Sequence, residues 1–235
     1  MNQIHAFLFL IAFPIIASAD TFDIGGRTIT IPSPAGYVRV TNDMPTVKRI
    51  VDQMVDQSND TLAFYIPESS VASTLAGEIP NVKRYYILKV NKKLKNSTLS
   101  TSDFSEMRTM MAAQNKKIVD EMKLKIPEYM AQASHSISKE FNIDFSANIP
   151  KIIPLDPHYN DERAFSFSQF AKCDTTMSGE QTSAVNVVTT TFLLSAGKLI
   201  FLYAYGNRED LDWTRTSSEA WQKSILSSNA PTPLH

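Results

Sequence analysis

The stretch TSAVNVVTTTFLLSAGKLIFLYAYG, residues 182–206, decides the fold of this chain. It holds two runs of β-branched, apolar and aromatic residues, and a short segment, residues 195–198, joins them. Runs of this length bounded by turn residues are typical of strands, and a glycine in a short connection indicates a hairpin. The second run is apolar on both alternating faces, which predicts a strand that is covered on each side. We therefore expect a central hairpin in a sheet with cover on both faces.

A further strand is predicted just before this hairpin, over residues 162–175, where phenylalanines recur on one face. The turn at residues 177–180 joins it to the hairpin. Strands joined by such short turns run antiparallel, so the C-terminal part is expected to be a three-stranded meander. A last helix over residues 211–227 would then dock on the sheet.

The N-terminal half shows hairpin, helix and strand patterns in turn. Gly25 and Gly26 separate two short apolar segments, which indicates a two-residue hairpin. A helix is predicted from Pro45, because proline is favoured in the first turn of a helix. Further strands are predicted over residues 61–66 and 84–94.

The longest helical segment follows, and Thr101 or Ser102 is expected to cap its start. Pro127 lies inside this pattern, and because proline has no N–H we expect it to break or kink the helix, with a second helix after it. Three further prolines punctuate residues 143–160, which are therefore predicted to be a loop.

The order of these elements predicts an α+β fold, an antiparallel sheet with a C-terminal three-strand meander, flanked by helices. We expect one domain over residues 20–228 and a disordered tail over residues 229–235, which contain two prolines. Cys173 is the only cysteine among 235 residues, so no intramolecular disulfide can form. A chain of this length can bury enough apolar surface without one.

The first residues of the chain have a different composition. Residues 6–16 form an uncharged apolar run, AFLFLIAFPII, and Ala-Ser-Ala follows at residues 17–19. A short apolar core before an A-x-A-like site predicts a secretory signal peptide over residues 1–19. The run is too short to span a bilayer as a helix, so no transmembrane segment is expected after cleavage. The sequence therefore predicts an exported protein, periplasmic or secreted.

Three features together resemble a known family. They are the segment FDIGGRTITIPSPAGYVRV near the N-terminus, the late meander, and the closing tryptophan-containing helix after LIFLYAYG. In this order they resemble the PsbP-like α/β/α sandwich, over most of the mature chain. The resemblance implies a binding or assembly role more often than catalysis, and it assigns no site because no family motif is matched.

Catalytic and cofactor motifs are absent from the sequence. A net charge of −1 gives no basic excess of the kind that nucleic-acid binding requires. Two S-x-x-K matches, at residues 136–139 and 195–198, lack the companion motifs of serine–lysine enzymes. Cys173 shares a face with apolar residues, which favours burial over reactivity. No catalytic residue and no cofactor is predicted.

One loop gathers a histidine with carboxylates, namely Asp156, His158 and Asp161. Imidazole and carboxylate groups can bind a divalent metal, so a metal-dependent hydrolase is one alternative. Polar residues of this kind are also typical of a solvated connection, and their spacing fixes no coordination geometry.

We favour a non-catalytic binding or assembly protein whose partner is a protein in the cell envelope or outside the cell. Tyr37 and Tyr159 are candidate contact residues, on loops, together with the edge strand of the sheet. The lysines of residues 89–95 could meet an acidic partner, although nearby acids more simply make them a balanced, solvated face. A small-molecule or lipid carrier, with a pocket between a methionine-rich helix and the sheet, is the other alternative.

Overall fold

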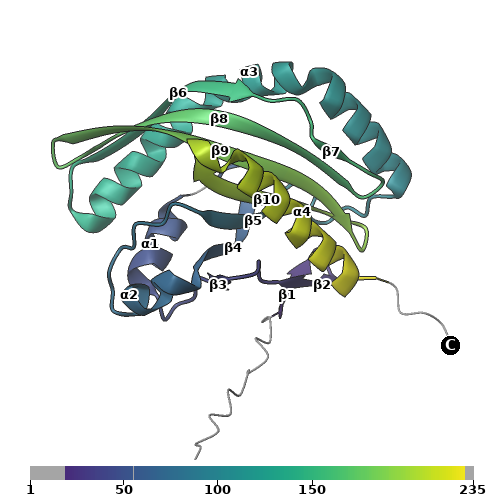
Figure 1. Ribbon diagram of the computed structural model, residues 1–235, viewed down its shortest axis with the longest axis horizontal. Coiled ribbons are helices and arrows are strands. Elements are labelled where there is room, and N and C mark those ends of the chain that lie inside the picture. The colour runs from purple at the N-terminus through teal and green to yellow at the C-terminus, as the bar shows by residue number, and fades with distance from the viewer. Residues whose placement is uncertain (1–18, 55, 231–235) are drawn as a thin grey trace, which may run out of the picture.

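The computed structural model describes residues 19–54 and 56–230 (Figure 1). Apart from Ala19, the predicted signal peptide lies outside the described residues, as does most of the predicted tail. Asn229, the first residue of that tail, uses its side-chain amide to bond both the N–H and the C=O of Thr30. No helix in the described ranges is both long and apolar enough to cross a membrane.

Within the described residues, the strands form two sheets. The smaller sheet is the predicted N-terminal hairpin, β1 (Ala19–Ile24) and β2 (Arg27–Pro32). The larger sheet is antiparallel, with the order β3-β4-β5-β10-β9-β8-β6, and β7 also pairs with β8. Its strands are β3 (Tyr37–Arg39), β4 (Asn59–Pro67), β5 (Tyr85–Asn91), β6 (Phe145–Pro154), β7 (Tyr159–Asn160), β8 (Ala164–Met177), β9 (Glu180–Ser195) and β10 (Lys198–Asn207).

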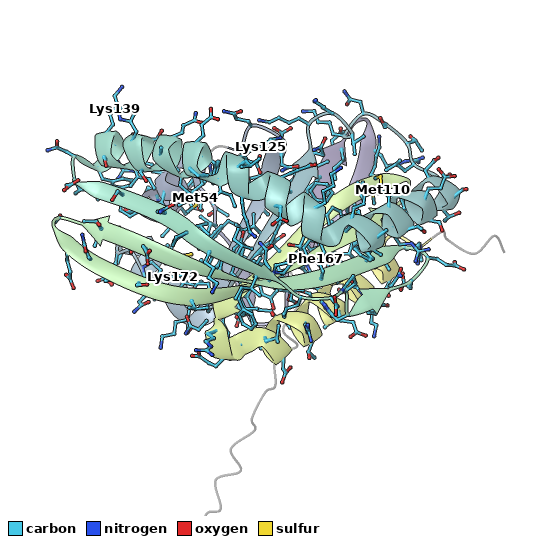
Figure 2. All side chains as sticks on the ribbon, turned by 90° about the horizontal axis from the view of Figure 1, so that it is seen from above. Met54, Met110, Lys125, Lys139, Phe167 and Lys172 are labelled. Atoms are coloured by element: carbon cyan, nitrogen blue, oxygen red, sulfur yellow. The ribbon has the colours of Figure 1, made fainter. Side chains whose placement is uncertain are left out.

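Helices flank this sheet, so the fold is the predicted α+β class, with β8, β9 and β10 as the C-terminal meander (Figure 1). Figure 2 shows the longest helix running along the side of the sheet that carries Phe167. The helices are α1 (Pro45–Gln53), α2 (Val71–Leu75), α3 (Thr101–Phe141) and α4 (Leu211–Ser228), with short 3₁₀ turns η1 (Glu68–Ser70) and η2 (Arg208–Asp210).

The central hairpin of β9 and β10 is covered on both faces, as its sequence predicts. Ile200 and Leu202 pack with Trp221 of α4 and with the β1–β2 hairpin. The alternate residue Phe201 packs on the opposite face with Phe104 of α3. Burying each such side chain contributes about 1.5–3 kcal/mol to stability. The Trp221 indole N–H also donates to the carbonyl of Pro32 at 2.8 Å, which fixes α4 to β2.

The expected cap of the long helix was wrong by one or two residues. Ser100 caps α3, not Thr101 or Ser102. The Asp103 N–H donates to the Ser100 hydroxyl oxygen at 3.1 Å, and the Ser100 N–H donates to the Asp103 carboxylate at 2.8 Å. This reciprocal arrangement is a capping box, and the carboxylate three residues after the cap selects Ser100 among three adjacent hydroxyl residues.

The prediction that Pro127 ends a first helix was also wrong, because α3 continues through it to Phe141. The Pro127 ring is exposed, and the helix arches along the sheet (Figure 1). Ala133 and Ile137, on the next turns, are buried. The packing of the helix on β6 and β8 therefore outweighs the loss of one backbone hydrogen bond.

The expected loop over residues 143–160 contains two strands instead, β6 and β7. β6 is an edge strand that pairs with β8, and its register shifts between Asn148 and Lys151, around Pro150. Proline is tolerated at an edge and at a bulge, because no ladder hydrogen bond is lost there. The prolines therefore marked an edge strand, not a loop.

Candidate functional site

The loop with the predicted metal ligands is held by its own hydrogen bonds. The Tyr159 hydroxyl donates to Asp161 Oδ2 at 2.7 Å. Asp161 Oδ1 accepts the N–H groups of Arg163 and Ala164 at 2.8 and 2.6 Å. Asp161 therefore closes the turn between β7 and β8, with both carboxylate oxygens already bonded.

His158 lies beside α4, close to Arg215 and Glu219. The backbone N–H of His158 donates to the carbonyl of Ser166 at 3.0 Å. The ring atom Nδ1 is buried without a hydrogen-bond partner among the described residues. Burial, and secondarily the positive charge of Arg215, lower the pKa of His158 to about 4, while Glu219 acts weakly in the opposite direction. The imidazole is therefore neutral at neutral pH.

Asp156 is exposed and borders a small hollow between α3 and the end of β6. In the described part of the chain, no three His, Cys, Asp or Glu side chains are grouped so that they could hold a metal ion. The structure thus joins Asp161 to Tyr159 and His158 to α4, and it does not bring the three candidate ligands Asp156, His158 and Asp161 together.

The two tyrosines predicted as contact residues are both anchored. The Tyr37 ring packs edge-on against Tyr86, with ring centroids 4.7 Å apart, and lies near Trp213. Burial raises the pKa of Tyr37, and Arg84 opposes the shift. The hydrogen bond to Asp161, then burial, raise the pKa of Tyr159 to about 12. Both rings are half-buried, so neither is a free aromatic anchor.

The possible nucleophiles are also occupied or covered. Cys173 is half-buried, accepts a hydrogen bond from Asn186 Nδ2 at 3.5 Å, and has a thiol pKa that burial raises. A raised pKa disfavours the reactive thiolate. Ser195 and Lys198 lie opposite each other at the central turn, and both are buried. The Lys198 ammonium donates to two backbone carbonyls, so it is not positioned as a base for Ser195.

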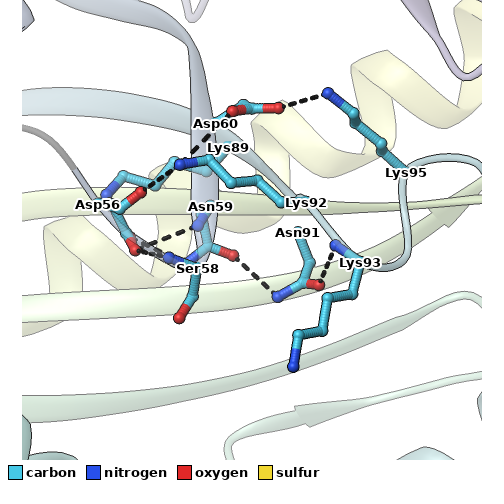
Figure 3. A network of polar contacts seen from close by, with 9 residues as sticks. All are labelled: Asp56, Ser58, Asn59, Asp60, Lys89, Asn91, Lys92, Lys93 and Lys95. Atoms are coloured by element: carbon cyan, nitrogen blue, oxygen red, sulfur yellow. Dashed lines mark hydrogen bonds and ion pairs between the residues drawn. The ribbon is translucent and has the colours of Figure 1, made fainter.

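The lysines of residues 89–95 lie at the ends of β4 and β5, where three of the four pair with Asp56 or Asp60 (Figure 3). Lys89 Nζ lies 3.0 Å from Asp56 Oδ2, and Lys95 Nζ lies 2.9 Å from Asp60 Oδ2. Burial would raise the pKa of Asp56, but hydrogen bonds from Asn59 and Lys89 and the charge of Lys89 outweigh it and lower the pKa. The expected balance is therefore only partial, since two carboxylates meet four lysines, and an open groove of about 380 Å³ lies beside this network.

The methionine-rich stretch of α3 contributes to the core. Met111 is buried and Met107 is partly buried, and both pack with Phe104 and Phe165. Met110 points outward and is 52% exposed (Figure 2). In this part of α3, side chains therefore fill the space that a carrier would need.

The backbone edges of the large sheet are a different kind of surface, because unpaired N–H and C=O groups can bind another strand. The edge of β6 is closed by α3. The N–H of Phe145 donates to Ser138 Oγ at 3.1 Å, and the N–H of Ala147 donates to Ser134 Oγ at 3.0 Å. The two prolines of this strand have no N–H to offer. Most of this edge is therefore unable to accept a strand.

The opposite edge of the sheet is short or irregular. β3 has three residues and pairs with β4 from Tyr65 to Pro67, and the N–H of Val40 adds one bond to the carbonyl of Phe64 at 2.8 Å. The uncovered part of β4 has a register shift between Thr61 and Ala63, and the charged network lies next to it. Short strands, bulges and charges are the usual devices that prevent edge pairing.

The β8–β9 hairpin carries a long stretch that has no bulge and only one charged residue, Glu180, along its free side. β10 pairs with β9 only as far as Asn207 with Asn186, so residues 180–185 of β9 extend beyond it. β8 and β9 themselves pair without a register shift from Ala164 to Met177, and the end of the hairpin projects past β10, while β6 accompanies β8 to Met177 (Figure 1). We call residues 172–185 the arm. Residues 180–185 are all exposed.

The direction of the backbone groups in the arm follows from one hydrogen bond. The N–H of Leu194 donates to the carbonyl of Arg163, in line with β8, at 2.8 Å. Because this direction alternates along an antiparallel strand, even-numbered residues of β9 face β8 and odd-numbered residues face the other side. In the arm these odd-numbered residues are Gln181, Ser183 and Val185, and no described strand pairs with them on the side away from β8. Their N–H and C=O groups form an open edge.

Side-chain hydrogen bonds hold the arm in place. Thr175 and Thr182 lie opposite each other with their hydroxyl oxygens 2.6 Å apart, and Ser183 Oγ donates to Asp174 Oδ1 at 2.7 Å. Such cross-strand pairs stabilise a hairpin by about 0.2–1 kcal/mol each. The open edge is therefore presented by an ordered ladder.

The sequence predicted the turn at residues 177–180 and a strand on each side of it, but not that this end of the hairpin extends beyond β10. Alternating apolar residues reveal covered strands, and residues 174–183, DTTMSGEQTS, have no such pattern. The turn at Ser178 and Gly179 was predicted within a longer span, residues 177–180. Both turn residues have positive φ, 52° and 85°, as a tight hairpin requires.

Fold and surface together define an α+β protein with a helix-flanked antiparallel sheet and a projecting arm. No model of a known protein family matches the chain, and no curated protein matches it.

Several solved structures are similar to the chain, including one yeast and one cyanobacterial protein. The Ran-binding protein Mog1p of Saccharomyces cerevisiae is 10% identical, with a TM-score of 0.33, over 91% of this chain and 93% of Mog1p. The cyanobacterial PsbP (CyanoP) of Synechocystis sp. PCC 6803 is 10% identical, with a TM-score of 0.29, over 91% of this chain and 92% of that protein. The weak resemblance of element order to the PsbP-like family, which the sequence indicates, is therefore also seen in the comparison with solved structures. At these scores the likeness assigns no site and no ligand.

Proposed function

We propose that this chain is an exported, non-catalytic binding protein that associates by adding a strand to its arm. One observation carries the proposal, namely the open edge formed by Gln181, Ser183 and Val185. In strand addition, main-chain hydrogen bonds give the affinity and the flanking side chains give the specificity. The arm offers both on an exposed, ordered hairpin.

The alternatives have less support in the geometry. A hydrolase would need Asp161 and His158 free to act, yet Asp161 is bonded through both oxygens and His158 is packed beside α4. A carrier would need space beside Met107 and Met111, where core side chains pack. Neither alternative explains an unprotected strand edge.

The direct test places a photo-cross-linking residue at Gln181 and, as a control, at Ile153 on the closed β6 edge. Both positions are exposed in the described structure. In cells that make the protein, we expect a discrete adduct from position 181 and none from position 153.

A second substitution, Ser183→Pro, should remove that adduct while the protein stays folded. It deletes an N–H that points away from β8, and proline is tolerated at such a position. The matched variant Thr182→Pro deletes an N–H that faces β8 and should disrupt the arm itself. An adduct that survives Ser183→Pro would contradict strand addition.

Export is tested by the N-terminus of the mature protein. We expect mass spectrometry of the medium or periplasmic fraction to find a chain that begins at Asp20, because residues 1–19 match a signal peptide. Ala19 is the first residue of β1, and cleavage there still leaves five residues of that strand, from Asp20 to Ile24, paired with β2. A chain that retains residues 1–19 inside the cell would refute export.

A further inference from the structure

The open edge of the arm is complementary to a second copy of itself. We propose that two copies of this chain pair their arms antiparallel through β9, about a twofold axis at Thr182. This inference rests on the proposed strand addition and names the occupant of the same edge. It is argued from the register, the side chains and the charges of residues 180–185.

The register follows from the direction of the backbone groups. Odd-numbered residues of β9 face the open edge, so they must bond to odd-numbered residues of the second copy. A twofold axis at Thr182 places Gln181 opposite Ser183 of the second copy, as a hydrogen-bonded pair. It places Thr182 opposite Thr182 of the second copy, as the closer, non-hydrogen-bonded pair.

The side chains suit this register. Within one copy, Thr175 and Thr182 already pair through their hydroxyls at 2.6 Å. Pairing Thr182 with Thr182 of the second copy would continue that row of threonines across the axis, and threonine pairs are favourable across strands. Except for Glu180 and Gln181, residues 180–185 have small or β-branched side chains, which can approach closely.

The charges also allow the pairing. Glu180 is the only charged residue of this stretch, and the register places it opposite Ala184 of the second copy. Like charges are therefore not opposed, as they would be in an edge protected against itself. The stretch contains no lysine, no proline and no bulge, in contrast to the β4 and β6 edges.

The assembly closes at two copies. A twofold pairing uses the same surface on both copies, so each open edge is covered once. β10 ends opposite Asn186, which limits how far the second arm can slide along β9. The expected product is a dimer and not a fibre.

The experiment measures mass by light scattering over a range of concentrations for residues 20–235. We expect a dimer for the unchanged protein, and monomers for Thr182→Lys and Thr182→Glu, since each places like charges opposite each other at the axis. Mixing the two variants should restore a dimer that contains one copy of each. Thr109→Lys and Thr109→Glu, at an exposed threonine of α3 outside the arm, serve as matched controls and should remain dimeric.

Each outcome separates this inference from the proposed function. The unchanged protein could be monomeric at every concentration while position 181 still cross-links another protein. That result would overturn pairing with a second copy but would still support strand addition from a different partner. A dimer that persists in both Thr182 variants also overturns it, because another surface must then be used. If hydrogen exchange in the monomeric variants shows the amides of Gln181 and Ser183 protected, the edge is not open and both proposals fail.

Discussion

The ammonium group of Lys198 donates to the backbone carbonyl of Lys95 at 3.1 Å, so that one lysine holds the main chain of another. A second bond reaches the carbonyl of Ser97 at 3.0 Å. Lys198 is only 3% exposed and stands at the start of β10. The segment that leads from β5 to α3 is therefore tied to the central hairpin by a buried cation, while the Lys95 side chain pairs with Asp60.

Lys198→Met should lower the free energy of unfolding by about 1–3 kcal/mol, because it removes two charge-assisted hydrogen bonds to carbonyl oxygens. Lys93→Met is the matched control, since Lys93 is an exposed lysine of the same segment whose side chain forms no ion pair among the described residues. Urea unfolding of both variants measures the difference. Equal unfolding midpoints would show that the buried bonds contribute nothing.

Gly25→Ala should destabilise the protein more than Gly26→Ala. Both glycines have positive φ, 56° and 77°, so each alanine costs about 1 kcal/mol in the turn. A Cβ at Gly25 would overlap the carbonyl oxygen of Lys95, whereas a Cβ at Gly26 meets nothing within 4 Å. Thermal unfolding of the pair isolates the contact between the hairpin and Lys95, and similar losses would argue against it.

Ser134→Ala should expose the β6 edge at Ala147, because the Ser134 hydroxyl oxygen accepts the Ala147 N–H at 3.0 Å. We expect a loss of about 1 kcal/mol in stability and faster hydrogen exchange of the Ala147 amide. Ser136→Ala, on the same helix, is the control because no hydrogen bond of its side chain is found among the described residues. Unchanged exchange at Ala147 would mean that the helix does not protect this edge.

Stability should fall as the pH is lowered from about 6.5 to about 4. The pKa of His158 is about 4 in the folded protein and near 6.5 when unfolded. In that window the unfolded chain takes up a proton that the folded chain does not, which favours unfolding. His158→Gln should flatten this part of the pH profile in urea unfolding. An NMR titration that gives His158 a midpoint near 6.5 would contradict the burial beside Arg215.

The elements that hydrophobic periodicity specifies were predictable from the sequence. The turn at Gly25 and Gly26, the meander and the doubly covered β10 follow from apolar alternation bounded by turn residues. Local chemistry was harder to interpret. Three adjacent hydroxyl residues could cap α3, and only the bond between Ser100 and Asp103 decides among them.

The prolines and the polar arm show why the rest was missed. Pro127 is compatible with α3 because its ring is exposed, and Pro150 is compatible with β6 because it lies at a bulge in an edge strand. Both reasons depend on tertiary structure, which the local sequence does not show. The candidate ligands Asp156, His158 and Asp161 were chosen by residue type, whereas their roles depend on Tyr159 and α4. A strand edge is open because no neighbouring strand pairs with it, and no residue type in the sequence predicts that absence.

The pairing of β5 with β10 has a consequence for how the protein folds. It sets Tyr85 opposite Tyr205, and it is the strand contact that joins the N-terminal strands of the sheet to the C-terminal meander. All of α3 lies in the loop that this pairing closes, so the entropy of a long loop opposes it. The meander can form from local turns, but the complete sheet must wait until nearly the whole chain has been made. During that interval β5 and β10 each have one open edge, and a chain that crosses a membrane before folding would pass through in this open state.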